Sequence, residues 1–280
     1  MKIIESFDLN LAPVTVSITM PVGRVDEFFP VTLQSVLQQT YKNFELIIVC
    51  KDSICSEVKR LVEAAGGDIA CQVIPTRLAG VAFAANLCIA HARGELIARW
   101  DADDLCDPSR LTRQVEEFQK DPALAVLGTR VVIVDENAKP NPVHAFKFYS
   151  DNASIRKALK YRQPLLHSAL MFRAKVLLDA RGYLYGHTSE DHEMFIRIAR
   201  NSAAVFKNLP DVVTYYRRHS KQLSDVSHLH NHFVEISGFM LTEFLRTWNP
   251  MYLLGAVVNF PIFRRVRHWR RTSRANQHQV

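Results

Sequence analysis

Glu95-Leu-Ile-Ala-Arg-Trp-Asp-Ala-Asp-Asp104 joins an apolar segment to an acidic one. Its first part, residues 95–100, is a mostly apolar run that predicts a buried strand. Its second part, residues 101–104, carries three carboxylates in four positions. Ligands of open α/β sheets bind beyond the carboxyl ends of the strands. We therefore expect this strand to deliver an acidic site to the edge of a sheet.

The chain before this stretch repeats a strand followed by a helix. Strands are predicted over residues 14–20, which alternate apolar and polar side chains, over the apolar run 45–50, and over 69–74. We expect Pro21 to end the first strand. Apolar residues at helical spacing follow the strands, from Pro30 onward, over 58–65 and over 81–92. This alternation predicts right-handed crossovers and a mainly parallel sheet.

The chain beyond residue 104 is less regular. Helices are predicted over residues 108–120, 175–180, 189–199 and 228–248. Strands are predicted over residues 124–134, 168–173 and 212–216. We assign residues 1–225 to a main domain and residues 226–280 to a helical C-terminal extension that is first apolar and then basic.

The composition is that of a globular protein. Hydrophobic residues make up 48% and charged residues 22%, which excludes a disordered or collagen-like chain. The five cysteines contain no CxxC pair, so we expect reduced structural thiols of a cytosolic protein instead of a disulfide framework or a zinc site. No GxGxxG and no P-loop follows the first strand, which argues against dinucleotide binding by a Rossmann fold.

Six ordered segments give the chain a strong resemblance to glycosyltransferase family 2. They are VSITMPVGR (16–24), SVLQQTYKNFELIIV (35–49), ARGELIARWDADDLCDPSRL (92–111), HSALMFR (167–173), SEDHEMFIR (189–197) and YYRRHSKQLS (215–224). The resemblance implies a GT-A fold, a Rossmann-like, mainly parallel sheet with flanking helices, and makes residues 1–225 the catalytic domain. It also implies a nucleotide-sugar donor, with a UDP-linked sugar as the expected one.

The acidic stretch is the DxD motif of this family by resemblance. Departure of a nucleotide diphosphate builds negative charge, which a divalent cation offsets. Mn²⁺ or Mg²⁺ is the expected cofactor because both prefer oxygen ligands. Asp103 is the expected metal ligand, and Asp101 contacts the ribose or supports the metal. Asp104 is expected to point away and to fix the loop. Other expected donor-binding residues are Pro21, Val22, Asp52 and Arg77.

The SEDHEMFIR segment resembles the catalytic acid pair of the family. Transfer with inversion needs a base that deprotonates the acceptor hydroxyl. The resemblance assigns this role to Asp191, with Glu190 as its support, and it supplies the inverting outcome. It places a further set on the acceptor and diphosphate side: His167, Arg173, Arg217 and His219.

Two departures from the family pattern leave alternatives open. The family's DDGS-like element is replaced by Cys50-Lys51-Asp52-Ser53, so the nucleotide base that the site reads is undetermined. Gly23 removes a side chain that would line the base pocket. The enzymatic alternative is a nucleotidyltransferase, which would need a glycine-rich loop after the first strand. The other alternative is a degenerate family member that acts as a scaffold.

The C-terminal extension is predicted to touch a membrane surface over residues 248–274. An apolar stretch of 13 residues, 251–263, is too short to span a bilayer. Six arginines follow it and account for six of the seven net positive charges, so the main domain is not a basic nucleic-acid-binding domain. Aromatic residues, a short apolar segment and adjacent arginines are typical of a segment in the membrane interface. The alternative is a final helix that packs on the catalytic domain.

Location and acceptor follow from these features together. The N-terminus carries Glu5 and Asp8 where a signal peptide would need an apolar run. We therefore expect a cytoplasmic protein, peripheral on the inner face of the plasma membrane. Family resemblance implies a saccharide acceptor, lipid-linked, in the synthesis of cell-surface polysaccharide such as lipopolysaccharide, O-antigen or capsule.

Overall fold

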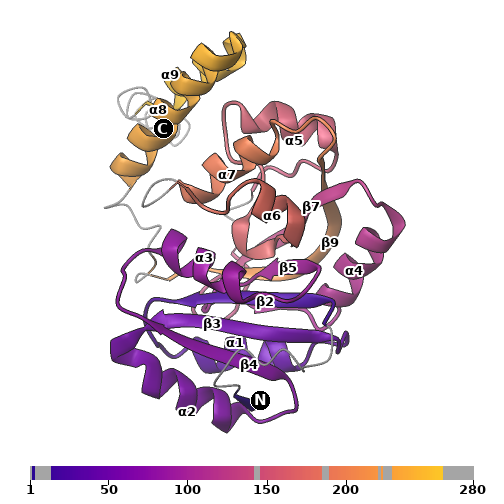
Figure 1. Ribbon diagram of the computed structural model, residues 1–280, viewed down its shortest axis with the longest axis vertical. Helices are drawn as coiled ribbons and strands as arrows, with labels where there is room; N and C mark the ends of the chain where they lie inside the picture. The colour runs from indigo at the N-terminus through magenta and orange to yellow at the C-terminus, as the bar shows by residue number, and fades with distance from the viewer. Residues whose placement is uncertain are drawn as a thin grey trace, which may run out of the picture.

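A nine-stranded sheet runs through the centre of the protein, with the strands in the order β1-β4-β3-β2-β5-β8-β7-β9-β6 (Figure 1). The computed structural model describes residues 2–3, 14–141, 146–184, 189–219, 222 and 229–260. The strands are β1 (Lys2–Ile3), β2 (Val16–Val22), β3 (Phe44–Lys51), β4 (Ala70–Thr76), β5 (Leu96–Arg99), β6 (Leu105–Cys106), β7 (Leu124–Val134), β8 (Met171–Arg173) and β9 (Val205–Arg217).

The sheet is mostly parallel, as the strand–helix alternation predicts. β2 pairs in parallel with β3 and β5, and β4 pairs in parallel with β3 and β1. β7 and β9 are also parallel. β8 is antiparallel to β5 and β7, and β6 is antiparallel to β9. The predicted α/β class is confirmed.

Helices cover both faces of the sheet, so the strands are buried on both sides. On β3, Leu46 and Ile48 pack in one core while Ile47 and Val49 pack in another. This alternation explains why β3 is apolar at successive positions. The helices of the first face are α1 (Phe29–Leu37), α2 (Cys55–Ala65) and α4 (Arg110–Lys120). Those of the second are α3 (Val81–His91), α5 (Asn152–Leu159), α6 (Ala174–Asp179) and α7 (Glu190–Ile198).

Pro21 does not end the first strand, contrary to the sequence-based prediction. β2 continues through Val22, and Pro21 stays in register with Val49 of β3. The carbonyl oxygen of Thr19 accepts a hydrogen bond from the backbone N–H of Trp100, so odd-numbered residues of β2 face β5. β5 has ended at Arg99, so the N–H that Pro21 lacks would have had no strand partner.

Two other elements differ from their predicted bounds. β9 begins at Val205 instead of residue 212, because its first half pairs with β7 although it carries polar residues and Pro210. The predicted strand over 168–173 is a 3₁₀ turn, η2 (His167–Ala169), followed by the short β8. Pairing with neighbouring strands, which sequence periodicity does not report, sets both boundaries.

The last two helices join the core of the second face. α8 (Leu229–Thr247) contributes Ile236 and Met240 to that core, and α9 (Pro250–Asn259) contributes Tyr252 and Ala256. In α9, a Cβ on Gly255 would lie 2.1 Å from the carbonyl oxygen of Lys160, so only glycine permits this close approach. The boundary between residues 225 and 226 lies outside the described residues, but α8 and α9 pack on the main domain.

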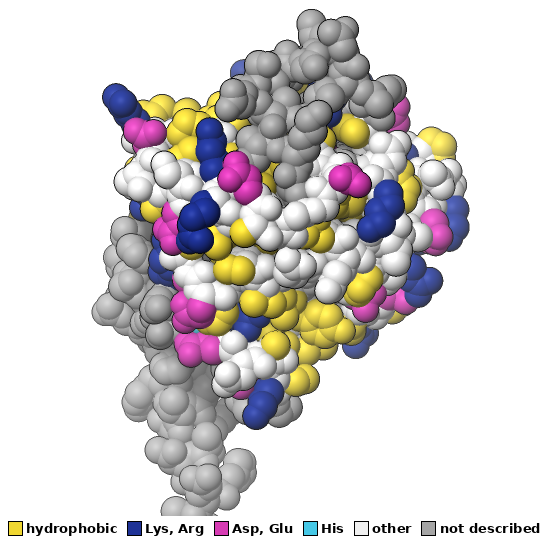
Figure 2. Space-filling model, turned by 90° about the horizontal axis from the view of Figure 1, so that it is seen from below, with side chains coloured by type: hydrophobic (Ala, Val, Ile, Leu, Met, Phe, Trp, Pro, Cys, Tyr) yellow, Lys and Arg dark blue, Asp and Glu magenta, His cyan; other side chains and the backbone are white. Residues whose placement is uncertain are grey.

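The described surface mixes both signs of charge. On the face shown in Figure 2, basic and acidic side chains are interspersed and neither gathers into one large patch. All five cysteines are buried and free, as expected of structural thiols. Among the helices that the structure describes, none combines the length and the apolar character needed to cross a bilayer. The six arginines, Arg264 to Arg274, lie outside the described residues.

Candidate active site

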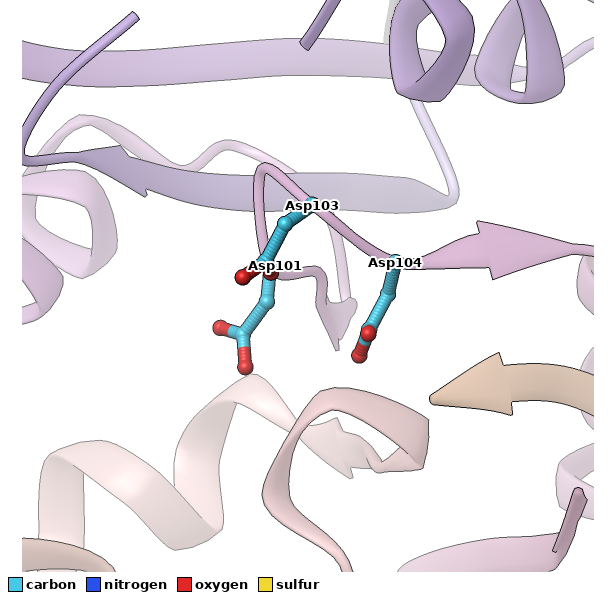
Figure 3. A group of neighbouring side chains, drawn as sticks. All are labelled: Asp101, Asp103 and Asp104. Carbon is cyan, nitrogen blue, oxygen red and sulfur yellow. The ribbon is translucent and has the colours of Figure 1, made fainter. Parts of the chain in front are cut away.

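Three aspartates form a cluster in the turn that follows β5. One carboxylate oxygen from each of Asp101, Asp103 and Asp104 lies within 4.8 Å of the others. Figure 3 shows the three side chains projecting to the same side of the turn. The prediction that Asp104 points away is therefore wrong. It assumed an extended chain, whereas the N–H of Asp104 donates to the carbonyl oxygen of Asp101 and the backbone folds back.

Side chains from the end of β5 and from the far end of β9 hold the first two aspartates. The guanidinium of Arg99, at the end of β5, lies 2.6 Å from Asp101 Oδ1. His219 Nε2 lies 2.9 Å from Asp103 Oδ2. Arg217 Nε donates to the backbone oxygen of Asp103 at 3.0 Å. The end of β9 therefore closes over the acidic turn and positions its carboxylates.

Asp104 is the buried anchor of the cluster. Its Oδ1 accepts from the backbone N–H of Arg217 at 2.9 Å, and its carbonyl oxygen accepts from Thr32 Oγ1 at 2.9 Å. The prediction that Asp104 fixes the loop agrees with these bonds. Its Oδ2 is buried without a hydrogen-bond partner among the described residues. Burial, followed by the charges of Asp103 and Asp101, raises the pKa of Asp104 well above its usual range.

The donor set suits a divalent cation. Burial raises the pKa of Asp101 despite Arg99, and the charges of Asp103 and Asp191 add to the rise. A cation that binds between three converging carboxylates relieves the repulsion among their negative charges. Their oxygens are ligands that Mn²⁺ and Mg²⁺ prefer. The residues present therefore fit the metal that the sequence predicts, with Asp104 added to Asp101 and Asp103.

Arg99 and Arg110 are supporting residues that the sequence interpretation missed. Arg110 is fully buried, donates to the carbonyl oxygen of Arg99 at 2.9 Å, and its guanidinium stacks 4.4 Å from the Trp100 ring. Arg99 donates to the carbonyl oxygen of Trp100 at 2.7 Å. The sequence offered a signal for Arg99, which is an arginine inside an otherwise apolar strand. A buried charge of this kind needs a specific partner.

The second pair of acids begins α7. Burial, followed by the neighbouring charge of Asp191, raises the pKa of Glu190 to about 8. Asp191 Oδ2 accepts from Gln163 Nε2 at 2.7 Å, and its Oδ1 accepts from the backbone N–H of His192 at 2.6 Å. At neutral pH Glu190 is therefore largely protonated. Two carboxyl groups whose environments differ in this way are suited to different roles in acid–base chemistry.

Of the other predicted acceptor-side residues, His167 lies at the site and Arg173 does not. His167 Nε2 lies 2.6 Å from the hydroxyl of Tyr183, whose pKa is raised by burial and by the charges of Glu190 and Asp191. Burial and Arg99 hold the pKa of His167 well below its usual range. Arg173 is elsewhere. It pairs with Leu96 at the opposite end of β5 from the aspartates, and its guanidinium donates to backbone carbonyls, including that of Leu124 at 2.9 Å. The structure therefore does not bring Arg173 into the site.

The predicted donor-side residues lie at the carboxyl ends of the parallel strands. Pro21 and Val22 end β2, and Asp52 follows β3. Arg77, just beyond β4, lies 3.4 Å from Asp52, and both side chains are exposed at the surface. The two residues are partners of each other, so neither is fixed by the interior of the protein.

A profile described as "Glycosyl transferase family 2" matches residues 17–178, more than half of the chain. The chain belongs to glycosyl transferase family 2. This membership confirms the resemblance read from the six segments and identifies the protein as a glycosyltransferase. It decides against the nucleotidyltransferase alternative.

Relatives within family 2 include enzymes named for polysaccharide synthesis. The chain is 29% identical over 248 residues to the O-antigen biosynthesis glycosyltransferase WbnJ of Escherichia coli, covering 88% of this chain and 94% of that protein. It is 24% identical over 193 residues to the amylovoran biosynthesis glycosyltransferase AmsE of Erwinia amylovora, covering 69% and 71%. Both relatives are thus named as glycosyltransferases of polysaccharide biosynthesis.

Solved structures share the fold. S. aureus TarS 1–349, in complex with UDP-GlcNAc, aligns with a TM-score of 0.65 at 16% identity, over 82% of this chain and 67% of that one. The mannosyltransferase PcManGT from Pyrobaculum calidifontis, in complex with GDP-Man and Mn²⁺, aligns with a TM-score of 0.60 at 17% identity, over 89% and 76%. These likenesses confirm the predicted GT-A fold.

Proposed function

We propose that this glycosyltransferase is metal-dependent and inverting, and that it moves a sugar from a nucleotide diphosphate to a hydroxyl of a saccharide. One observation carries the proposal: the three-aspartate cluster and the acid pair of α7 lie close enough for the charge of Asp191 to raise the pKa of Asp101. One group suits a cation and diphosphate, and the other suits an attacking hydroxyl. A family 2 site needs both within reach of one sugar.

The donor side consists of the aspartates and the residues that hold them. A divalent cation bound by Asp101, Asp103 and Asp104 would offset the charge that develops on the leaving diphosphate. Arg217 and His219 keep the turn in place, because they bond to the backbone of Asp103 and to its carboxylate. Solved relatives of the fold hold UDP-GlcNAc or GDP-Man, which supports a nucleotide-sugar donor here. We propose a UDP-linked sugar.

The acceptor side consists of the acid pair. Asp191 takes the proton of the acceptor hydroxyl as its oxygen forms a bond to the anomeric carbon. Glu190 does not compete for that proton, because its raised pKa keeps it largely protonated near pH 7. The buried, neutral His167 adds no positive charge beside the base. With Glu190 protonated and His167 neutral, Asp191 is the group of these three that carries the negative charge of a base.

We also propose that the acceptor is linked to lipid and that the enzyme works at the cytoplasmic face of the plasma membrane. Large apolar residues are exposed along the last two helices, and six arginines follow in the sequence. Apolar and basic groups in succession suit an anionic bilayer surface. The exposed set, here called the α8–α9 apolar surface, is Val234, Leu241, Leu245, Trp248, Leu253, Leu254, Val257 and Phe260.

A panel of nucleotide sugars tests the donor proposal. Thermal stability is measured with UDP- and GDP-linked sugars, each with Mn²⁺ and with EDTA, and release of the nucleoside diphosphate is then measured for any donor that binds. We expect stabilisation that requires Mn²⁺ and a preference for UDP-linked sugars. Equal stabilisation in EDTA would contradict metal dependence. Binding without any cleavage or transfer would favour the scaffold alternative.

A further inference from the structure

A glutamine from outside the six family-like segments touches the proposed base. Gln163 Nε2 donates to Asp191 Oδ2 at 2.7 Å. The direction of the bond follows from chemistry, because an ionised carboxylate only accepts and the amide nitrogen only donates. Gln163 Oε1 is buried and has no hydrogen-bond partner among the described residues, so the bond to Asp191 is the one that the structure gives to this side-chain amide.

The bond completes a two-sided hold on the carboxylate. Asp191 Oδ1 is held by the backbone N–H of His192 on its own helix, whereas Oδ2 is held by Gln163 from the chain that follows α5. A second contact links the same two elements, because the Nε2 of His192 on α7 lies 2.8 Å from the carbonyl oxygen of Leu159 at the end of α5. The start of α7 and the end of α5 are therefore joined in both directions. The carboxylate plane of Asp191 is fixed by two separate elements.

The turn that carries Gln163 is itself held in place. At the start of the turn, the backbone N–H of Tyr161 donates to the carbonyl oxygen of Ala158 at 2.9 Å. At the end of the turn, Pro164 restricts the backbone conformation of Gln163, the residue before it. On the outer side, Asn259 Nδ2 of α9 donates to the carbonyl oxygen of Tyr161 at 3.0 Å. A donor on a fixed turn orients its partner better than one on a mobile side chain does.

We propose that Gln163 is the positioning residue for Asp191, orienting this carboxylate toward the acceptor hydroxyl and stabilising its ionised form. The inference rests on the proposed role of Asp191 as base. A hydrogen bond to a charged group is among the stronger ones in proteins, and loss of such a bond changes rate constants by about 10-fold or more. Because Gln163 contacts neither the aspartate cluster nor Asp52, it acts on the acceptor step and leaves donor binding unchanged.

The test measures cleavage of the donor with water as acceptor, so no acceptor need be known. UDP-GlcNAc and GDP-mannose are supplied with Mn²⁺, and release of UDP or GDP is followed over a range of pH. The C1–O bond to the diphosphate breaks, a C1–O bond to water forms, and the water proton passes to Asp191. The variants are Gln163→Leu, which keeps the size but removes the donor, and Gln163→Glu, which is isosteric.

Gln163→Leu is expected to lower kcat by about 10-fold with the KM for donor unchanged. The acidic limb of its kcat–pH profile should move to higher pH, because the ionised carboxylate loses a donor. The titratable groups that interact electrostatically with Asp191 include Glu190, Asp101 and Tyr183, and they are the same in wild type and variant. Gln163→Glu should lose more activity at pH 8 and regain part of it on acidification, when the introduced carboxyl again donates.

Two comparisons separate this inference from the proposed function. Gln38→Leu makes the same substitution at the exposed end of α1 and should behave as wild type. In an Asp191→Asn background, Gln163→Leu should cause no further loss, since both act through one carboxylate. An inactive Asp191→Asn beside a normal Gln163→Leu overturns the positioning role alone. A normal Asp191→Asn overturns the assignment of the base. If Gln163→Leu fails to fold, a wild-type pH profile in Gln163→Glu overturns the inference.

Discussion

His219 Nε2 lies 2.9 Å from Asp103 Oδ2, although 116 residues separate them in the sequence. The His219 side chain is 1% exposed, so this contact is made inside the protein. It connects the chain beyond β9 to the turn beyond β5 and fixes the aspartate that the sequence singles out as metal ligand. The acidic turn is therefore held by the second half of the domain.

Asp103→Asn is expected to abolish Mn²⁺-dependent donor binding while the protein stays folded. The substitution removes a charged ligand atom from the cluster but keeps its size. Calorimetry with UDP and Mn²⁺ measures the effect, and Asp179→Asn, on an exposed ion pair of α6, is the control. Unchanged affinity in Asp103→Asn would remove Asp103 from the metal site.

His219→Ala should weaken Mn²⁺ binding by about 10-fold without abolishing it, because partners of metal ligands act by orienting them. Mn²⁺ titration followed by paramagnetic relaxation of water protons gives the affinity directly. A variant that binds Mn²⁺ as tightly as the wild type would show that Asp103 is positioned by its other contacts, such as the bond from Arg217 to its backbone.

Asp191→Asn should retain donor binding but lose transfer by about 10²-fold or more, the usual scale for a missing general base. The amide cannot take the proton of the acceptor. Donor affinity by calorimetry and turnover by nucleoside diphosphate release separate the two effects. A fall in donor affinity instead would indicate that Asp191 binds substrate.

Glu190→Gln should be more stable than the wild type at pH 8 in the absence of metal. Burial and Asp191 raise the pKa of Glu190 in the folded protein to about 8, above its value in the unfolded chain. The unfolded state therefore loses this proton first, and wild-type stability falls as the pH rises from about 4.5 to 8. The glutamine has no such proton. Thermal melts in EDTA at pH 5.5 and pH 8 should differ less in the variant.

Replacing Leu253, Leu254 and Val257 of the α8–α9 apolar surface by serine should reduce sedimentation with anionic vesicles and leave the melting temperature nearly unchanged, because all three are exposed. Leu178→Ser, an exposed apolar residue on α6, is the control. Vesicle binding that equals the wild type would contradict the membrane role of this surface.

Truncation after Thr247 has a different expected outcome. It removes Tyr252 and Ala256, which are buried in the core of the second face. The truncated protein should melt at a lower temperature and lose activity on any acceptor, because the turn before Gln163 also loses its bond from Asn259. A truncated protein with the full melting temperature would show that α9 does not stabilise the catalytic domain.

The alternating strands and helices, the acidic turn after β5 and the acid pair at the start of α7 could be predicted from the sequence alone. These features are local: apolar periodicity specifies buried strands and helix faces, and the DADD and SED segments carry their chemistry in adjacent residues. Their order along the chain was also sufficient to indicate the family. Parallel strands place their carboxyl ends at one edge, so the position of the site followed from the fold class.

Which side chains share that site depends on how distant elements pack together. Asp104 lies in the cluster because the turn folds back. Arg173 lies outside the site because β8 is antiparallel to β5, which places Arg173 beside Leu96 at the start of β5. Gln163 reaches Asp191 across 28 residues through the packing of α5 against α7. Such contacts depend on strand direction, turn conformation and helix packing. These are properties of elements brought together from distant parts of the chain, which no local pattern encodes.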